Sequence, residues 1–291
     1  MHKVALFTAF LVLFVVGAAH SQDSTDPKVE EFRNKLRALD WVSGPRSVTV
    51  SSNSTLQLPE GYVYLDASNT TKFSELNENF SSGKEVMVAP RNLAWTAYLE
   101  FSDDGYVKDD EKIDAAAILK SLKDGTEASN EERRRRGWPD LHVVGWNIQP
   151  AYNNSTKRLE WATLLRSDRA ESSNFFTKIL GRRGVTTVVL ASQPDDTQAA
   201  VADLDRVLTT YRFNTGETYA EWRPGDKVAE YGLTGLILGG AVAAAVKTGL
   251  LKGFWKVLVA GAAAFWKVIA VGAAAAFAGL KSLFKRKQSP P

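Results

Sequence analysis

Short stretches of alternating apolar and polar residues recur through the middle of the chain, which is the pattern of half-buried β-strands. The sequence predicts strands at residues 48–58, 62–65, 92–102, 141–149, 157–166, 174–180 and 185–191. The turn Pro59-Glu60-Gly61 separates two of them, and Gly181-Arg182-Arg183-Gly184 closes the last hairpin. We expect the glycines of that hairpin to supply the positive φ that a tight turn needs.

Apolar residues at helical spacing mark the segments between these strands. Helices are predicted at residues 23–38, 71–80, 113–135 and about 195–211. Strands followed by helices, with few βαβ units, predict an α+β fold that has a largely antiparallel sheet and flanking helices. We expect residues 22–230 to form one such domain.

The first 21 residues have the pattern of a signal peptide. Lys3 gives a positive start, residues 4–16 are apolar, and small residues follow at 17–21. The apolar run is shorter than the roughly 20 residues that a membrane-spanning helix needs. We therefore predict that residues 1–21 are cleaved, after either Ala19 or Ser21; an uncleaved anchor or a buried helix is the alternative.

The C-terminal part is largely apolar, and its charged residues are lysines and one arginine. Residues 231–251 would be about 31 Å long as a helix, which is enough to cross a bilayer. A transmembrane helix is predicted there. With a cleaved signal peptide, such a helix leaves the preceding domain extracytoplasmic.

Residues 252–291 contain an eleven-residue repeat, in which Phe-Trp-Lys-Val occurs twice, and a basic tail. Eleven residues are close to three helical turns, so the repeated tryptophans share one face of a helix, as do the repeated lysines. The unfavourable free energy of inserting a lysine into the membrane nearly cancels the favourable free energy of inserting the apolar residues. The segment is therefore either an amphipathic interfacial helix or a second membrane helix. A single crossing keeps the tail cations inside, and we favour it. The residues predicted at the membrane interface are Trp255, Lys256, Trp266 and Lys267.

Charge is divided between the domain and the tail. All 33 Asp and Glu residues lie between Asp23 and Glu230, whereas the chain from Lys247 onward carries only positive charges. The net charge of +3 therefore averages an acidic domain and a basic tail, which argues against nucleic-acid binding. The absence of cysteine removes disulfides, thiolate catalysis and cysteine-bound zinc.

No catalytic, metal-binding or cofactor-binding pattern stands out in the domain. His142 lies between Trp138 and Trp146, but a general base needs an orienting acid and a target, so we interpret it as a strand histidine packed against aromatic rings. The acids of residues 103–111 lack the spacing of a calcium loop. Arg133–Arg136 point in different directions on a helix and do not form one basic face.

The same region supplies a candidate interaction surface. Aromatic anchors dominate protein interfaces, and arginines at a hairpin tip can reach lipid phosphates or a partner's acids. The candidate residues are Trp138, His142, Trp146, Trp161, Arg182 and Arg183. As the exposed turn of a hairpin, the two arginines also need no function.

Several long motifs occur in order along the chain. They are Trp41-x-x-Gly44-Pro45, Leu56-x-Leu58-Pro59-Glu60-Gly61-Tyr62, Gly105-Tyr106-Val107-Lys108-Asp109-Asp110-Glu111, Gly137-Trp138-Pro139-x-Leu141-His142-Val143-Val144-Gly145-Trp146, Arg158-Leu159-Glu160-Trp161, Leu180-Gly181-Arg182-Arg183-Gly184 and Pro224-Gly225-Asp226-Lys227-Val228-Ala229-Glu230-Tyr231-Gly232. By these motifs the chain resembles, from Trp41 to about Gly240, a bacterial domain-of-unknown-function family labelled "predicted membrane-anchored protein". The resemblance implies an exported, membrane-anchored protein without an established activity, and it supplies no catalytic residue. The motifs do not place the tandem Phe-Trp-Lys repeat in that family.

Together these features predict a membrane-anchored envelope protein whose main domain is extracytoplasmic, or periplasmic in a Gram-negative cell. We expect the domain to be a non-enzymatic binding module. Its expected partners are the lipid bilayer and an envelope protein or cell-surface component, without a cofactor and without nucleic acid. One alternative is an envelope hydrolase that uses a pair of carboxylates. Another is a protein whose Trp/Lys-repeat tail is itself membrane-active.

Overall fold

The computed structural model describes residues 27–238, and their centre is an antiparallel sheet of eight strands. In order across the sheet the strands are β1 (Val42–Ser43), β4 (Tyr62–Leu65), β5 (Val86–Pro90), β6 (Thr96–Ser102), β10 (Val185–Ser192), β9 (Glu171–Leu180), β8 (Arg158–Arg166) and β7 (His142–Asn153). Neighbours along the chain pair as hairpins at β5–β6, β7–β8, β8–β9 and β9–β10. The predicted α+β fold with a largely antiparallel sheet is confirmed.

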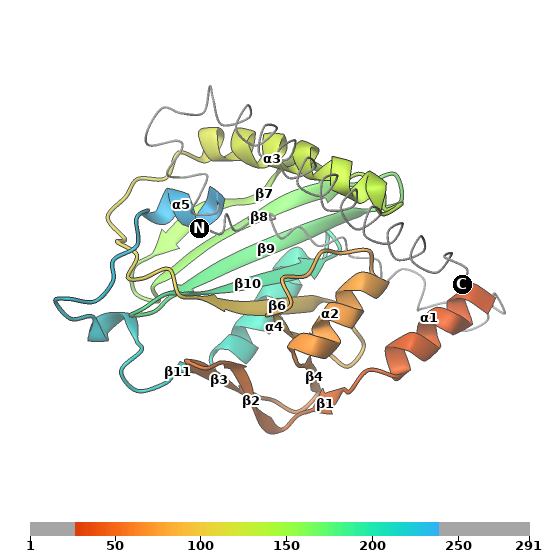
Figure 1. Cartoon of the computed structure of the whole chain (residues 1–291), viewed down its shortest axis with the longest axis horizontal. Coiled ribbons are helices and arrows are strands. Elements are labelled where there is room, and N and C mark those ends of the chain that lie inside the picture. The colour runs from red at the N-terminus through yellow and green to blue at the C-terminus, as the bar shows by residue number, and fades with distance from the viewer. Residues whose placement is uncertain (1–26, 239–291) are drawn as a thin grey trace, which may run out of the picture. The chain divides into compact units, whose positions relative to one another are not determined.

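Helices and a second, smaller sheet cover the two faces of the large sheet (Figure 1). On one face lie α2 (Ala67–Leu76), α3 (Ala115–Arg135) and α5 (Leu233–Leu238), which contribute Phe73, Ile118 and Leu233 to one core. On the other face lie α4 (Thr197–Leu208) and the three-stranded sheet β11 (Tyr211–Phe213), β3 (Ser54–Leu58) and β2 (Arg46–Ser51), which form a second core. Helix α1 (Pro27–Arg37) precedes β1, and the short 3-10 helix η1 (Tyr219–Glu221) follows β11.

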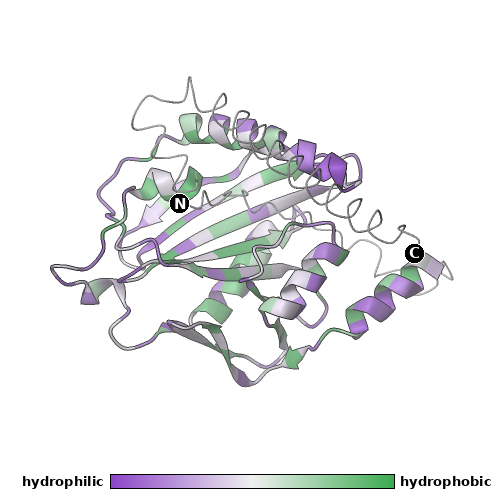
Figure 2. Ribbon diagram, viewed as in Figure 1, coloured by the Kyte–Doolittle hydropathy of each residue, from purple (hydrophilic) through white to green (hydrophobic). Residues whose placement is uncertain are grey.

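Side chains of the central strands alternate between these two cores, because successive residues of a strand point to opposite faces. In β8, Leu159 and Trp161 belong to the core under α2, α3 and α5, whereas Ala162 belongs to the core under α4. In β9, Phe176 and Phe175 are divided in the same way. Figure 2 shows the resulting mixture of apolar and polar positions along the strands. We call the face covered by α2, α3 and α5 the α3 face of the sheet.

Local capping explains where several elements begin. Asp66 accepts a hydrogen bond from the Asn69 backbone N–H at 2.9 Å, so α2 starts at Ala67 and ends at Leu76 instead of spanning the predicted 71–80. Asp114 caps α3 in the same way, by accepting from the backbone N–H groups of Ala116 and Ala117. The predicted strand at 92–102 begins only at Thr96, and β5 was not predicted.

The β9–β10 turn is tight for a different reason from the one expected. Positive φ angles occur at other glycines, such as Gly61 with φ 88°, but not at Gly181 or Gly184. A Cβ atom on Gly181 would lie 2.8 Å from the Phe213 ring, and one on Gly184 would collide with the carbonyl oxygen of Ser102. Close approach of neighbouring segments, and not backbone handedness, therefore requires glycine at both positions.

The ends of the chain bear on the predicted membrane attachment. All described residues belong to the first of two units into which the chain divides, residues 1–240. Within 27–238, we find no helix long and apolar enough to cross a membrane. Leu233, Leu236 and Ile237 of α5 pack in the domain core, so the first turns of the predicted span at 231–251 belong to the domain. Three predicted segments lie outside the described residues: the remainder of that span, the signal peptide at 1–21 and the Trp/Lys repeat at 252–291.

Candidate functional site

The three tryptophans of the predicted interaction surface do not share a surface. Trp161 is 2% exposed and stacks on Phe176, with ring centroids 4.9 Å apart and an angle of 6° between the rings. Trp146 is half-buried and donates a hydrogen bond from its ring nitrogen to the Ala115 carbonyl at 3.3 Å. Trp161 is therefore a core residue, and the prediction that it contacts a partner is wrong.

Trp138 belongs to a small cluster of aromatic rings and arginines at the end of α3. Its ring lies 5.2 Å from that of Phe80, and the guanidinium groups of Arg133 and Arg136 lie 5.5 and 5.0 Å from the Trp138 ring. Arg133 is 1% exposed and donates from Nε to the Pro139 carbonyl at 2.6 Å. Burial also lowers the pKa of Arg133. Because its guanidinium is shielded from solvent and bonds the Pro139 carbonyl, Arg133 is not available to an external anion.

His142 is exposed, and its imidazole does not pack against aromatic rings as predicted. Its Nδ1 atom lies 2.6 Å from a carboxylate oxygen of Glu127 on α3. An exposed pair of this kind contributes little to stability. Among residues 27–238 no group of three or more histidine and acidic side chains is arranged to hold a metal ion.

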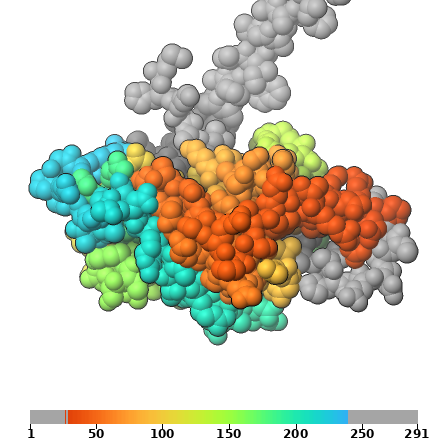
Figure 3. Space-filling view, turned by 90° about the horizontal axis from the view of Figure 1, so that it is seen from below, coloured from red at the N-terminus to blue at the C-terminus, as the bar shows by residue number. Residues whose placement is uncertain are grey.

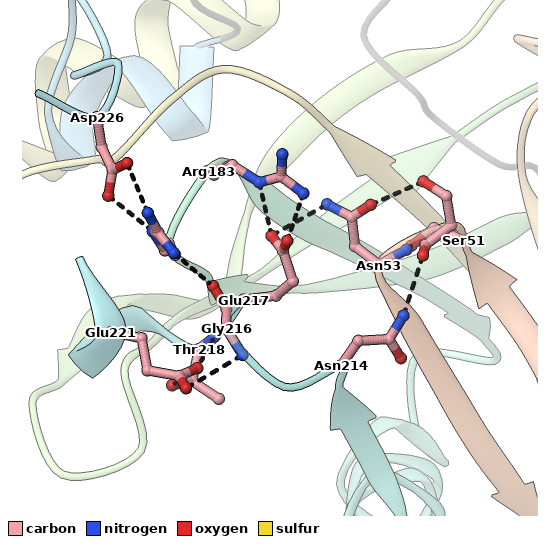
Figure 4. A network of polar contacts seen from close by, with 11 residues as sticks. Ser51, Asn53, Arg183, Asn214, Gly216, Glu217, Thr218, Glu221 and Asp226 are labelled. Atoms are coloured by element: carbon pink, nitrogen blue, oxygen red, sulfur yellow. Dashed lines mark hydrogen bonds and ion pairs between the residues drawn. The ribbon is translucent and has the colours of Figure 1, made fainter. Parts of the chain in front are cut away.

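Arg182 and Arg183 at the β9–β10 turn are held by acids from the chain after β11 (Figure 4). Arg182 donates to both carboxylate oxygens of Asp226, at 2.7 and 2.8 Å, and to the Gly216 carbonyl at 3.1 Å. Arg183 pairs with Glu217. The hydrogen bonds from Arg182 lower the pKa of Asp226 to about 2. Arg182 is therefore an internal clamp, and its guanidinium is already occupied.

This clamp fixes the loop of residues 222–228, which we call the 222–228 loop. On its other side the loop pairs with the segment after β6: the Tyr106 backbone N–H donates to the Lys227 carbonyl at 2.8 Å, and the Lys227 ammonium donates to the Asp103 carbonyl at 2.7 Å. The Trp222 ring lies 5.3 Å from that of Tyr106, which in turn stacks on Tyr219 at 4.4 Å. Contacts on both sides therefore hold the loop in one position.

The 222–228 loop carries the large apolar side chains that are most open to solvent in the described part of the chain. Trp222 is 38% exposed and Val228 is 39% exposed, and Arg223 and Lys227 are exposed beside them. The segment protrudes at one end of the domain in the space-filling view, where it is coloured cyan to blue (Figure 3). An apolar pair flanked by cations on a fixed loop is the surface feature that we take as the candidate functional site.

Sequence reasoning did not single out Trp222, although the signal was present. Trp222 precedes the turn residues Pro224 and Gly225, and a large aromatic residue beside a turn is a candidate for exposure. The motif that contains Asp226 was recognised, but its role as the partner of Arg182 depends on a contact across 44 positions of sequence.

An acid pair of the kind that a hydrolase would need does occur on the α3 face. Glu85 precedes β5 and lies next to Glu100 of β6, one step beyond the paired residues Val86 and Leu99. Glu85 is 1% exposed, and its carboxylate accepts from the backbone N–H groups of Ser82 at 2.6 Å and Lys84 at 3.1 Å. Because Glu85 stabilises this turn and is shielded from solvent, the two acids do not flank an open substrate position.

Comparison with known proteins agrees with the resemblance drawn from the motifs. Residues 42–276 match the model of a family described as protein of unknown function (DUF2167). The chain belongs to this family. No curated protein matches the sequence. Among solved structures, the solution structure of cyanobacterial PsbP (CyanoP) from Synechocystis sp. PCC 6803 is similar over 60% of this chain and 92% of that chain, with 8% identity and a TM-score of 0.33.

Proposed function

We propose that this DUF2167 protein is a membrane-anchored envelope protein whose α+β domain is a non-enzymatic binding module facing the membrane through the 222–228 loop. In this proposal residues 1–21 direct export, and the residues after Leu238 attach the chain to the bilayer. The domain is then extracytoplasmic, and periplasmic in a Gram-negative cell. Its partners are the lipid bilayer and an envelope protein or cell-surface component.

The exposure of Trp222 and Val228 carries this proposal. Both side chains lie on the loop that precedes α5, and α5 leads directly into the apolar C-terminal segment. Tryptophan is enriched at the membrane–water interface because its ring is apolar and its N–H is polar. Arg223 and Lys227 add positive charge, which attracts anionic headgroups by about 1 kcal/mol for each cation near the surface. The loop thus has the composition of an interfacial contact.

The two alternative functions have less support. The carboxylate hydrolase needs two accessible acids, and Glu85 is engaged within the domain. The membrane-active tail rests on the Trp/Lys repeat, which lies outside the described residues. Neither alternative explains why the apolar exposure of the domain concentrates in one short loop.

The absence of cysteine makes a direct test possible, because a single introduced cysteine can be labelled selectively. The full chain with Val228→Cys is labelled with an environment-sensitive fluorophore and reconstituted into vesicles of phosphatidylethanolamine and phosphatidylglycerol. Asp168→Cys is the matched control: it is exposed in the β8–β9 turn, and the ten residues of β9 separate that turn from the clamp, a distance of about 30 Å.

We expect headgroup-labelled quencher lipids to quench the label at position 228 strongly and the label at position 168 weakly. Cutting the chain after Leu238 keeps α5 and is expected to release the domain from the vesicles. Equal quenching at both positions would contradict the role of the 222–228 loop. Recovery of the full chain in a vesicle-free soluble fraction would contradict the membrane attachment itself.

A further inference from the structure

Three polar side chains lie side by side on the α3 face, in central strands of the sheet and toward the β9–β10 turn. Glu100 of β6 pairs with Thr187 of β10, and Thr187 pairs with Lys178 of β9. Each is two residues from a member of the core on this face: Tyr98, Val189 and Phe176. Because the strand period is two, the three side chains point to the α3 face. We call this row the charged strip.

The position of the charged strip is unusual for charged residues. The strands β6, β10 and β9 occupy the centre of the eight-stranded sheet, and their other inward positions are mostly buried. Lysine and glutamate are rarely buried in a core unless they are paired. All three side chains of the strip keep partial access to solvent, and Lys178 and Thr187 do so between strand neighbours that are buried. The strip is therefore a polar and partly accessible row on a face where other polar strand residues, such as Asn174, are buried.

Neither charged group of the strip is neutralised by an ion pair within the described part of the chain. The Lys178 ammonium donates to the Thr187 hydroxyl at 2.8 Å, and the Glu100 carboxylate accepts from the Ser82 hydroxyl at 3.0 Å. Burial is the main cause that lowers the pKa of Lys178 to about 8 and raises that of Glu100. Opposite charges act on both groups from beyond ion-pair distance: Asp104 and Glu100 on Lys178, and Lys84 and Lys178 on Glu100. A ligand that brings an opposite charge into direct contact with each group would offset the cost of desolvation.

The separation of the two charged residues across the sheet restricts that ligand. One strand lies between β9 and β6, so the Cα atoms of Lys178 and Glu100 are separated by two strand spacings, about 10 Å. A simple anion at Lys178 would be repelled by Glu100, and a simple cation at Glu100 would be repelled by Lys178. A ligand with a carboxylate at one end and an ammonium group at the other satisfies both.

We propose that the charged strip binds an extended zwitterion, with its carboxylate on the Lys178 ammonium, its ammonium group on the Glu100 carboxylate, and the Thr187 hydroxyl between them. Short peptides and ω-amino acids have this chemistry. The inference goes beyond the proposed membrane attachment and does not depend on it, because it rests only on side chains of the central sheet.

The test measures binding of ε-aminocaproate to the purified full chain in detergent by isothermal titration calorimetry. Caproate and hexylamine each carry one of its two charges, and glycine carries both charges too close together to reach both ends of the strip. A hydrogen bond to a charged group contributes enough for about a tenfold change in affinity or more. We therefore expect ε-aminocaproate to bind at least about tenfold more tightly than any of the three comparators.

Substitutions assign each end of the ligand. Lys178→Met is expected to lower the affinity for ε-aminocaproate to the affinity that the wild type has for hexylamine. Glu100→Gln is expected to lower it to the affinity that the wild type has for caproate. Lys123→Met, at an exposed position of α3, is the matched control and should leave binding unchanged. Equal affinity for all four compounds, or equal affinity of the wild type and both strip variants, would overturn the proposal. Neither result bears on the vesicle experiment, so the two proposals fail separately.

Discussion

Two fully buried asparagines on the α3 side of the sheet provide a direct test of how polar groups contribute to this fold. Asn130 of α3 and Asn174 of β9 are both 0% exposed. The Asn130 amide donates to the Leu141 carbonyl at 2.8 Å and accepts from the Leu141 backbone N–H at 2.9 Å. Neither polar atom of the Asn174 side chain has a hydrogen-bond partner within the described structure. The same substitution at the two sites should therefore have opposite effects.

The expected magnitudes follow from these contacts. Asn130→Leu leaves the N–H and carbonyl groups of Leu141, which is 1% exposed, without partners, and each such group costs about 1–3 kcal/mol. We expect the free energy of unfolding to fall by about 2–5 kcal/mol. At position 174, a leucine side chain has nearly the same shape as asparagine. Asn174→Leu therefore removes an amide whose burial costs about 1–3 kcal/mol without changing the packing much. We expect the free energy of unfolding to stay within about 1 kcal/mol of wild type or to rise by up to about 2 kcal/mol.

Urea unfolding of the full chain, followed by tryptophan fluorescence in one detergent, measures both effects. The two variants should have the same dependence on urea concentration as the wild type and should differ in the transition midpoint. If Asn174→Leu lowered stability as much as Asn130→Leu, the Asn174 amide would have partners that stabilise it, such as ordered water. The reasoning from its missing hydrogen bonds would then be refuted.

Two further predictions concern the β9–β10 turn and the loop that it holds. Because Arg182 lowers the pKa of Asp226 from 3.8 to about 2, the clamp contributes stability above about pH 4 and loses it as the pH falls toward 2. Asp226→Asn should remove this pH-dependent stability. The thermal midpoints of the wild type and the variant should therefore converge as the pH falls from about 4 toward 2. A difference in midpoint that stays constant over this pH range would count against the clamp. Gly184→Ala should lower the free energy of unfolding by about 1–3 kcal/mol because the new methyl group meets the Ser102 carbonyl. Gly125→Ala in α3, where an added Cβ meets nothing within 4 Å, should instead raise the free energy of unfolding by about 0.5–1 kcal/mol, and similar effects at the two glycines would refute this explanation.

Local patterns were sufficient to predict most of the longer elements but not their surroundings. The hairpins were predicted because each strand and turn has a signature within a few residues. Strand β5 was missed because Val86–Pro90 is buried on both faces and shows no alternation. The role of Trp161 was misjudged for a related reason: its strand has cores on both sides, so its aromatic side chain had no solvent face to occupy.

The features that matter most for function depend on contacts between distant segments. The sequence analysis did not single out the two charged residues of the strip, because only the register of three strands brings them into one row. Arg182 read as an exposed turn residue, and only the return of the chain after β11 supplies Asp226. A single sequence contains no signal for such pairings, because neither residue changes the local pattern that a strand or turn requires.

The charged strip and the 222–228 loop are connected through β6 and the residues that follow it. Glu100 lies near the end of β6, and two positions later the Ser102 hydroxyl donates to Asp104, whose negative charge also acts on Lys178. The next residues pair with the loop, since Tyr106 and Val228 form a β-bridge. A force applied to the loop at a membrane surface would therefore reach the acids around Lys178 through a short, hydrogen-bonded segment. Membrane contact and occupancy of the charged strip could influence each other only to the extent that this segment has two arrangements, because coupling requires a difference in affinity between two states.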